Sequence, residues 1–230
     1  MPSPSLHCIS SMATRLLLGD LAAQWQQRSG VETRVESVGG VDAAKRVAAG
    51  EAFDVVVLAS DALAKLQATG HVVAGSCVDL VRSGVAVAVR AGAPRPDIGS
   101  ETALRATVLA ARGIGYSTGP SGSALLRLFE RWGVADRLRE QLRQAPAGVP
   151  VGSMVAQGEV EIGFQQLSEL MHLSGITVLG GMPEGCAIDT TFSAGLCSAA
   201  TQAQAAGALI AYLRSADTAE LKRHHGMAPA

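Results

Sequence analysis

The feature that most constrains this chain is a nearly continuous apolar run at residues 53–59, FDVVVLA. Its consecutive valines favour a strand over a helix, because β-branched side chains lose rotamer freedom on a helix. A run without polar alternation is typical of a strand buried on both faces of a parallel sheet. Helical periodicity flanks it at residues 43–49, where Asp42 is the expected cap, and at residues 62–69. The sequence therefore predicts an α/β fold.

The same alternation of strand and helix continues along the whole chain. We expect further strands at residues 6–9, 31–38, 85–90, 113–117, 160–164, 176–179 and 192–197. We expect further helices at residues 11–28, over 104–109 with Ser100 as its cap, at 121–132, 134–142, from 151 onward, and at 167–173, 201–213 and 218–225. No low-complexity segment and no repeat with a period of 20 to 50 residues interrupts this pattern, which argues against a repeat protein.

Composition excludes several classes of protein. The 19 Lys and Arg residues balance 20 Asp and Glu residues, and no basic run occurs, which argues against a nucleic-acid partner. No apolar run approaches the about 20 residues that span a bilayer. The first twelve residues, MPSPSLHCISSM, lack the basic and apolar regions of a secretory signal. As it stands the sequence predicts a cytoplasmic protein, or a periplasmic one if a leader has been removed.

The spacings of the cysteine, histidine and glycine residues argue against a metal site and against a cofactor site. The four cysteines are far apart, so we expect buried free thiols. The histidines form no H-x-x-H or H-E-x-x-H pattern, and His224 and His225 are expected at the surface. The loop at residues 118–123 lacks the Gly-Lys-Ser/Thr of a phosphate-binding loop, and no G-x-G-x-x-G opens the first helix. We therefore predict no metal and no cofactor.

Hydroxyl and glycine residues follow the predicted strands where helices begin. In parallel α/β sheets these positions meet at the edge where ligands bind. Each serine alone is an ordinary helix cap. Taken together, and without basic neighbours, they predict a site that holds a small anion by neutral hydrogen bonds. The candidates from this argument are Ser10, Ser11, Gly40, Ser60, Ser121, Gly122 and Ser123.

Several of these segments also resemble a known family. The segments are ISSM before the first helix, AAKRVAAGEAFDVVVLASDALAKL, GIGYSTGPSG and VAQGEVEIGF. In order and spacing they resemble the type 2 periplasmic binding-protein fold, and within it the molybdate-binding component of bacterial molybdate ABC transporters. The resemblance covers nearly the whole chain, from Leu6 to about Gly226, and is more specific for the fold than for the ligand.

The resemblance implies a set of ligand contacts, two of which depart from the family pattern. The first-loop serine of the family falls on Ser11, and its backbone donors fall near Ser121 and Val151. Its second-loop serine falls on Gly40, which removes a hydroxyl. Its later tyrosine falls near Gln166, with Gln165 beside it. A compact cage for a tetrahedral oxyanion needs matched donors, so these changes predict a larger, organic anion that carries carboxylates.

The resemblance also implies the domain organisation. We expect one lobe of residues 1–83 and 191–230 and a second lobe of residues 84–190, with mostly parallel sheets flanked by helices. Two crossing strands, near residues 85–89 and 190–196, join the lobes, and the ligand binds in the cleft between them. Arg82 and Ser83, just before the first crossing strand, are the candidates for a charge partner of the ligand.

Two functions compete, and a third is open. The leading interpretation is a non-catalytic solute-binding protein for a small anion, which would meet an ABC transporter permease if it is exported. The alternative is an isomerase acting on a tricarboxylate such as aconitate, since the sequence also looks similar to trans-aconitate isomerase. That reaction needs a general base, and Asp61 and Glu169 are the candidates. The ligand-sensing domain of a transcription regulator has the same fold, but would need a DNA-binding extension.

Overall fold

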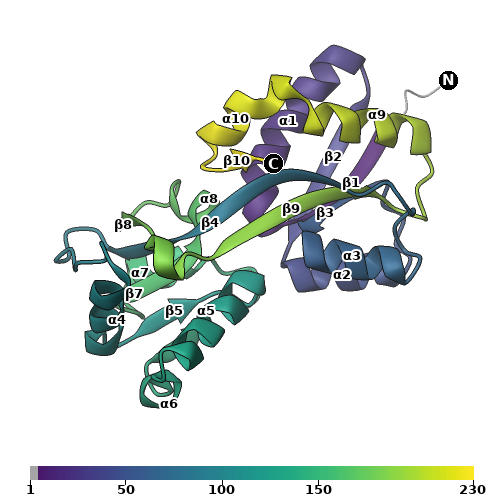
Figure 1. Ribbon diagram of the computed structural model, residues 1–230. Helices are drawn as coiled ribbons and strands as arrows, with labels where there is room; N and C mark the ends of the chain where they lie inside the picture. The colour runs from purple at the N-terminus through teal and green to yellow at the C-terminus, as the bar shows by residue number, and fades with distance from the viewer. Residues whose placement is uncertain (1–4) are drawn as a thin grey trace. The chain divides into compact units, whose positions relative to one another are not determined.

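The chain forms two compact units in a computed structural model that describes residues 5–230 (Figure 1). Unit 1 comprises the described residues up to Arg82 together with Thr191–Ala230, and unit 2 is Ser83–Thr190. The chain passes between the units twice, within the long strand β4 (Val78–Arg90) and within β9 (Asp189–Leu196). Helices alternate with strands in both units, so the predicted α/β class with two crossing strands is confirmed.

The sheet of unit 1 has the strand order β2-β1-β3-β9-β4. Strand β1 (Ser5–Ser11) pairs in parallel with β2 (Glu32–Val38) and with β3 (Val55–Ala59), and β9 pairs antiparallel with β3. The short strand β10 (Ala228–Pro229) pairs with β4. The helices of this unit are α1 (Arg15–Ser29), α2 (Gly40–Ala48), α3 (Ser60–Ala68), α9 (Ala203–Arg214) and α10 (Ala219–His224), with 3-10 turns at Met12–Thr14 and Ala216–Thr218.

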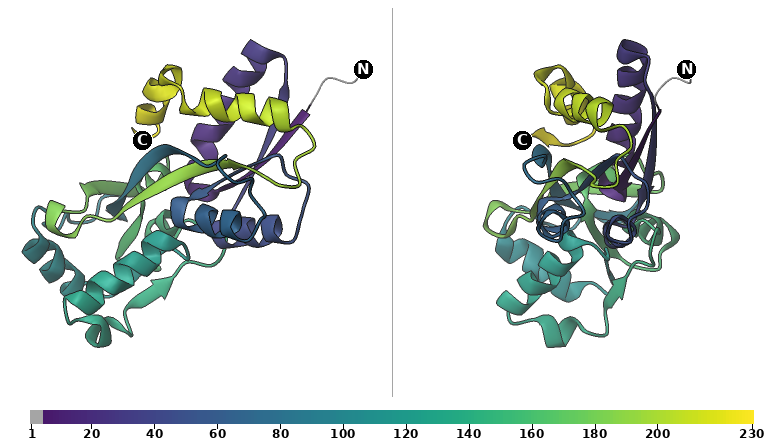
Figure 2. Two further views of the ribbon diagram at one scale, coloured as in Figure 1. Left: turned by 45° about the vertical axis from the view of Figure 1, so that its right-hand side comes forward. Right: turned by 90° about the vertical axis from the view of Figure 1, so that its right-hand side faces the viewer.

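Both faces of strand β3 are covered, which explains its unbroken apolar sequence. Val55 and Val57 belong to a core that α1 and α9 complete. Val56 and Leu58 point to the opposite face and pack with residues of α2 and α3. Two views show these helix pairs on opposite sides of the strands (Figures 1 and 2). All five residues of the strand are buried, as expected for a central strand.

The sheet of unit 2 has the order β4-β7-β5-β6, with β8 also paired to β4. Strand β5 (Ile114–Tyr116) runs parallel to β6 (Leu142–Gln144) and to β7 (Ile162–Gln166). Strand β4 is antiparallel to β7 and to β8 (Ile176–Gly181). The helices are α4 (Glu101–Ala110), α5 (Pro120–Arg131), α6 (Ala135–Leu138), α7 (Val151–Gln157) and α8 (Leu167–Leu170), with a 3-10 turn at Glu184–Cys186.

Helices also cover both faces of this second sheet. One core joins Ile114, Ile162 and Phe164 to residues of α4, α5 and α6. The other face carries α7, which lies very close to the strands. A Cβ atom at Gly163 would lie 2.6 Å from Val155 Cγ2, so only glycine lets α7 approach this strand.

Several predicted boundaries were wrong. The helix predicted at residues 134–142 ends at Leu138, and Leu142 is instead the first residue of strand β6. Helix α2 begins at Gly40, so Asp42 lies in its first turn and does not cap it. Strand β4 begins at Val78, which places Arg82 inside a strand. The predicted cap of α4 is confirmed, because the Ser100 side chain accepts a hydrogen bond from the backbone N–H of Ala103. Among residues 5–230, none of the helices is long and apolar enough to cross a membrane.

Candidate functional site

In unit 1, the segments that follow β1, β2 and β3 meet at one edge of the sheet. The register pairs Ser11 with Val38 at the ends of β1 and β2, and Ser10 with Val57 near the end of β3. A Cβ atom at Gly40 would lie 3.7 Å from Ser11 Cβ, so these two residues are neighbours. The predicted residues of this unit, Ser10, Ser11, Gly40 and Ser60, all lie at this carboxyl edge.

The two adjacent serines of β1 have different surroundings. Ser10 Oγ lies 2.8 Å from Ser37 Oγ, so its hydroxyl is engaged within the protein. Ser11 is only 7% exposed, and its Oγ has no hydrogen-bond partner within residues 5–230. It occupies the N-cap position of the Met12–Thr14 turn and yet makes no side-chain cap bond there. The Ser11 hydroxyl is thus a buried group that is free to bond a ligand.

In unit 2, the segments after β5, β6 and β7 also meet at one edge. Tyr116, the last residue of β5, pairs with Gln144 and with Phe164. Because the three strands are parallel, the residues that follow them lie at the same edge. Strand β4 reaches this edge from the opposite direction, since Val85 pairs with Gln166. This edge carries the predicted residues Ser83, Ser121, Gly122, Ser123, Val151, Gln165 and Gln166.

Polar groups at the edge of unit 2 are partly satisfied. Ser121 Oγ lies 3.0 Å from Ser117 Oγ. Gln166 Nε2 donates to Thr190 Oγ1 over 2.8 Å, while Gln166 Oε1 has no partner among the described residues. The Thr190 hydroxyl can donate as well as accept. If the Gln166 amide is flipped, its oxygen accepts from Thr190 Oγ1, and its NH₂ group takes the unpartnered position, where it can donate to a ligand. Ser83 is 1% exposed, and its Oγ likewise lacks a partner in residues 5–230.

The backbone N–H of Val151, predicted as a ligand donor, is already used within the protein. It donates to Gln165 Oε1 over 2.8 Å. Gln165 Nε2 in turn donates to Glu169 Oε1, also over 2.8 Å. The Gln165 side chain therefore bridges the start of α7 and the Glu169 carboxylate by hydrogen bonds. The prediction for Val151 needs this correction, because a satisfied N–H group has little left to offer a ligand.

The helices that begin at these edges are not capped by side chains, within the part of the chain that the structure describes. Helices α2, α3 and α5 follow the N-cap residues Gly39, Ala59 and Gly119, none of which makes a side-chain cap bond. Their first N–H groups keep the positive end of the helix dipole open to an anion. Helix α4 differs, because β4 runs antiparallel to β7 and α4 begins at the opposite edge, where Ser100 caps it. The expectation that serines act as ordinary helix caps is therefore wrong where α2, α3 and α5 begin.

Three other candidates differ from expectation in their placement. Arg82 is exposed within β4, pairs through its backbone with Ala228, and forms no ion pair in the described part of the chain. Ser60 is the first residue of α3 and is half-buried. Ser123 is exposed in the first turn of α5. A Cβ atom at Gly122 would overlap the Ser117 carbonyl oxygen, so glycine is required where α5 meets the end of β5.

The cysteines and the histidine pair near the C-terminus were not candidates for the site. All four cysteines are free thiols, and three of them are buried. His225 was expected at the surface but is buried, with Nε2 lying 2.8 Å from Asp20 Oδ2. Within residues 5–230, no group of three or more His, Cys, Asp or Glu side chains is arranged to hold a metal ion.

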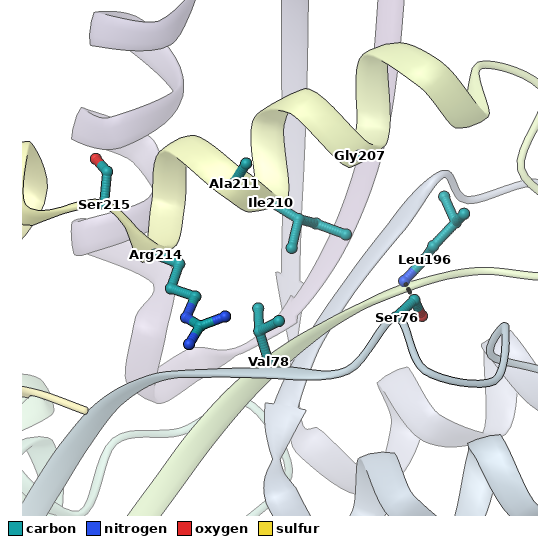
Figure 3. Close-up of a pocket in the computed structure, with 8 residues that line it drawn as sticks. All are labelled: Ser76, Val78, Leu196, Gly207, Ile210, Ala211, Arg214 and Ser215. Carbon is teal, nitrogen blue, oxygen red and sulfur yellow. Dashed lines mark hydrogen bonds between the residues drawn. The ribbon is translucent and has the colours of Figure 1, made fainter.

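Unit 1 also has an open groove of about 550 Å³ beside α9 (Figure 3). It is lined by Ser76, Val78, Leu196, Gly207, Ile210, Ala211, Arg214 and Ser215. None of the predicted site residues is among them. The groove is mainly apolar, and the Arg214 guanidinium lies at one end (Figure 3).

Sequence reasoning missed four polar residues at the two edges. Ser37 and Ser117 engage the predicted serines Ser10 and Ser121, and Thr190 fixes the Gln166 side chain. Ser168 is buried, and its Oγ has no partner in the described residues. The signal for Ser37 and Ser117 was present, since each lies at the end of a predicted strand and is followed by a glycine-containing turn.

Comparison with known proteins places the chain in a family. Residues 6–228 match the family model of the bacterial extracellular solute-binding proteins. The chain is 37% identical over 234 residues to an aconitate isomerase from Pseudomonas sp., covering 99% of this chain and 89% of that protein.

Solved structures with the same fold are more distant in sequence. The periplasmic molybdate-binding protein of Azotobacter vinelandii superposes with a TM-score of 0.81 at 18% identity, over 96% of this chain and 98% of that one. The substrate-binding domain of a putative molybdenum ABC transporter from Clostridium difficile gives 0.76 at 15% identity, over 99% and 100%. The predicted type 2 periplasmic binding-protein fold is therefore confirmed, and the chain belongs to the bacterial extracellular solute-binding protein family.

Proposed function

We propose that this protein binds a small organic polycarboxylate through neutral hydrogen-bond donors, among them buried hydroxyls that have no partner in the described residues. The observation that carries the proposal is the pair of buried, unpartnered hydroxyls at the two sheet edges, Ser11 in unit 1 and Ser83 in unit 2. A buried hydroxyl without a partner costs about 1–3 kcal/mol. A ligand carboxylate that accepts from each hydroxyl removes that cost.

The size of the ligand follows from the residues around these hydroxyls. Gly40 offers no side chain beside Ser11, and Gln166 presents a free amide atom at the edge of unit 2. A tetrahedral oxyanion is too small to fill the space beside Gly40 and to bond the Gln166 amide as well. Polar groups that a ligand leaves without a partner lower its affinity. The extra space and the amide suit a branched anion that carries several carboxylates. The 37% identity to an aconitate isomerase supports the same ligand class.

A screen of ligands tests the binding proposal. Thermal unfolding is followed with cis-aconitate, trans-aconitate and citrate, and in parallel with molybdate, tungstate and sulfate. A ligand present at 100 times its Kd stabilises the protein by about 2.7 kcal/mol. We expect stabilisation by a tricarboxylate and none by the inorganic oxyanions. Stabilisation by molybdate or sulfate alone would contradict the proposal.

We further propose that the bound tricarboxylate is isomerised, which makes the protein an enzyme of the aconitate isomerase type. The relative at 37% identity over almost the entire chain is the observation that favours this second function. Incubation of the protein with trans-aconitate, followed by proton NMR, tests it. We expect cis-aconitate to accumulate to an equilibrium ratio that is the same from either isomer. Tight binding without turnover would leave a solute-binding protein that delivers its ligand to an ABC transporter permease.

A further inference from the structure

We propose that Glu169 is the general base of the isomerisation and that Gln165 is its positioning residue. This inference rests on the proposed isomerase function and deepens it. The isomerisation of aconitate is a shift of one proton and one double bond. The base must remove a proton from the methylene carbon, next to the double bond, and must return a proton to the carbon that carried the vinylic hydrogen.

One of the two acidic residues that the sequence suggested, Glu169, lies in a segment at the edge of unit 2. Three segments lie there, at residues 117–123 and 145–151, which follow β5 and β6, and at residues 165–169, which comprise the end of β7 and the start of α8. Their sequences are STGPSGS, APAGVPV and QQLSE, so that Glu169 is their single acidic or basic residue. These segments otherwise supply hydroxyl, amide and backbone groups that can donate to a bound polycarboxylate.

Hydrogen bonds fix the orientation of this carboxylate. Glu169 is half-buried on α8, and its Oε1 accepts from Gln165 Nε2 over 2.8 Å. Gln165 is 3% exposed and is held in turn by the backbone N–H of Val151, which donates to Gln165 Oε1. A base that is oriented by a second side chain, itself fixed by a third group, is the arrangement expected of an activated catalytic residue.

The other candidate base lacks such support. Asp61 is exposed in the first turn of α3, and no hydrogen bond from a side chain holds its carboxylate in the described part of the chain. An exposed carboxylate is fully hydrated and free to rotate, which weakens it as a base toward a carbon acid. Of the two acidic residues that the sequence suggested, the geometry therefore favours Glu169.

The proposed step balances without a co-reactant. Glu169, as the carboxylate, takes a proton from the methylene carbon, and the electron pair of that C–H bond forms the new double bond. The old double bond shifts its electrons toward the neighbouring carboxylate of the ligand, whose added negative charge accepts hydrogen bonds from neutral donors at the edge. The neutral Glu169 then returns the proton to the former vinylic carbon and is again ionised.

Substitutions at both residues test the proposal on the full chain. Glu169→Gln is expected to lower kcat by about 10²–10⁴-fold, because the amide cannot take up the proton. The Kd for trans-aconitate should change less than about threefold, since uniform binding does not depend on the base. In D₂O the variant should also lose the exchange of the ligand's methylene protons. Glu169→Asp should recover part of the turnover.

Gln165→Leu separates positioning from chemistry. It keeps the bulk of the side chain and removes both hydrogen bonds, so kcat should fall about 10–100-fold with little change in KM, because a misplaced base costs that much. The matched control is Glu140→Gln, an exposed residue of the same unit whose carboxylate forms no hydrogen bond or ion pair within residues 5–230. Melting curves confirm that each variant folds.

The outcomes are distinct. Absence of turnover in the unchanged protein would overturn the isomerase function, and this inference with it. Turnover in the unchanged protein together with near-normal kcat for Glu169→Gln would overturn the assignment of Glu169 alone. Loss of trans-aconitate binding in a folded Glu169→Gln variant would overturn it as well, because the residue would then serve binding.

Discussion

At the scale of single residues, Asp54 shows how a buried charge fixes unit 1. Its carboxylate is buried and accepts hydrogen bonds from three backbone N–H groups, those of His7, Thr201 and Gln202. The first belongs to β1, and the other two lie just before α9. One side chain, directly before β3, therefore joins β1 to the start of a helix that is distant in sequence. Hydrogen bonds to a charged acceptor are among the stronger ones in proteins.

Removal of the Asp54 carboxylate should destabilise the protein. Asp54→Ala leaves three N–H groups without their acceptor, and we expect the free energy of unfolding to fall by about 3 kcal/mol. Urea unfolding followed by circular dichroism measures it. Asp61→Ala, which changes an exposed aspartate, serves as the control and should shift stability by no more than about 0.5 kcal/mol. Equal effects of the two substitutions would refute this role of Asp54.

The buried cysteines give a prediction about reactivity. Burial, followed by the nearby Asp54 carboxylate, raises the pKa of Cys8 and of Cys197 to about 12. At pH 8 only about one thiol in ten thousand is then ionised, and the thiolate is the reactive form. We expect a thiol reagent at pH 8 to label neither residue in the folded protein and both after unfolding in urea. Mass spectrometry of the labelled peptides checks this, and rapid labelling of folded Cys8 would contradict it.

At the scale of elements, the sequence predicts strands and helices well wherever packing on both faces dictates the pattern. The FDVVVLA run became β3 because both of its faces are covered, and Gly30 ends α1 in a left-handed conformation. Strand β6 was missed because its sequence, LRQ, is polar and lies at the edge of the sheet. Its strand conformation comes from pairing with β5, which no local pattern encodes.

The same limit applies to the candidate site. Topology alone predicted which loops carry it, because the carboxyl ends of parallel strands meet. The sequence could not indicate which polar atoms are already engaged. The Val151 N–H was expected to face a ligand and instead bonds Gln165, whereas the Ser11 hydroxyl lacks a partner in the described residues. Only the side-chain geometry separates these two cases.

Gly40 and Gly122 each lie in the first turn of a helix that begins at one of the two edges, and their substitution by serine is expected to have contrasting effects. A Cβ atom at Gly40 would meet only ordinary contacts, at 3.7 Å from Ser11 Cβ and 4.0 Å from Leu58 Cδ2. Gly40→Ser should therefore leave stability unchanged within about 0.5 kcal/mol, and it adds a hydroxyl beside Ser11. We expect weaker binding of tricarboxylates and a gain for compact oxyanions, measured by calorimetric titration.

Gly122→Ser is the contrasting substitution in unit 2. Its Cβ atom would overlap the backbone oxygen of Ser117, which cannot move without breaking the end of β5. We expect a loss of stability of about 1–3 kcal/mol, typical of overpacking against a rigid neighbour. If Gly122→Ser were as stable as Gly40→Ser, the close approach of α5 to β5 would not hold in solution.

At the scale of the whole molecule, each unit offers one candidate hydroxyl for the ligand, Ser11 in unit 1 and Ser83 in unit 2. The proposed function requires that these hydroxyls donate to the ligand. Ser11→Ala and Ser83→Ala test this, because each removes one buried hydroxyl without a partner in residues 5–230. Loss of such a group does not destabilise the unliganded protein, since no internal hydrogen bond is broken. A change in binding can then be attributed to the ligand contact.

We expect each substitution to weaken tricarboxylate binding by about 10–100-fold, the value of one hydrogen bond to a charged group. The stoichiometry in calorimetric titration should remain one ligand per chain in both variants. Ser174→Ala, an exposed serine of unit 2, is the control and should bind normally. If Ser83→Ala bound as tightly as the unchanged protein while Ser11→Ala did not, the Ser83 hydroxyl would take no part in binding. A Kd raised by both substitutions, with unchanged melting temperatures of the free protein, is the result that hydrogen bonds from both hydroxyls to the ligand require.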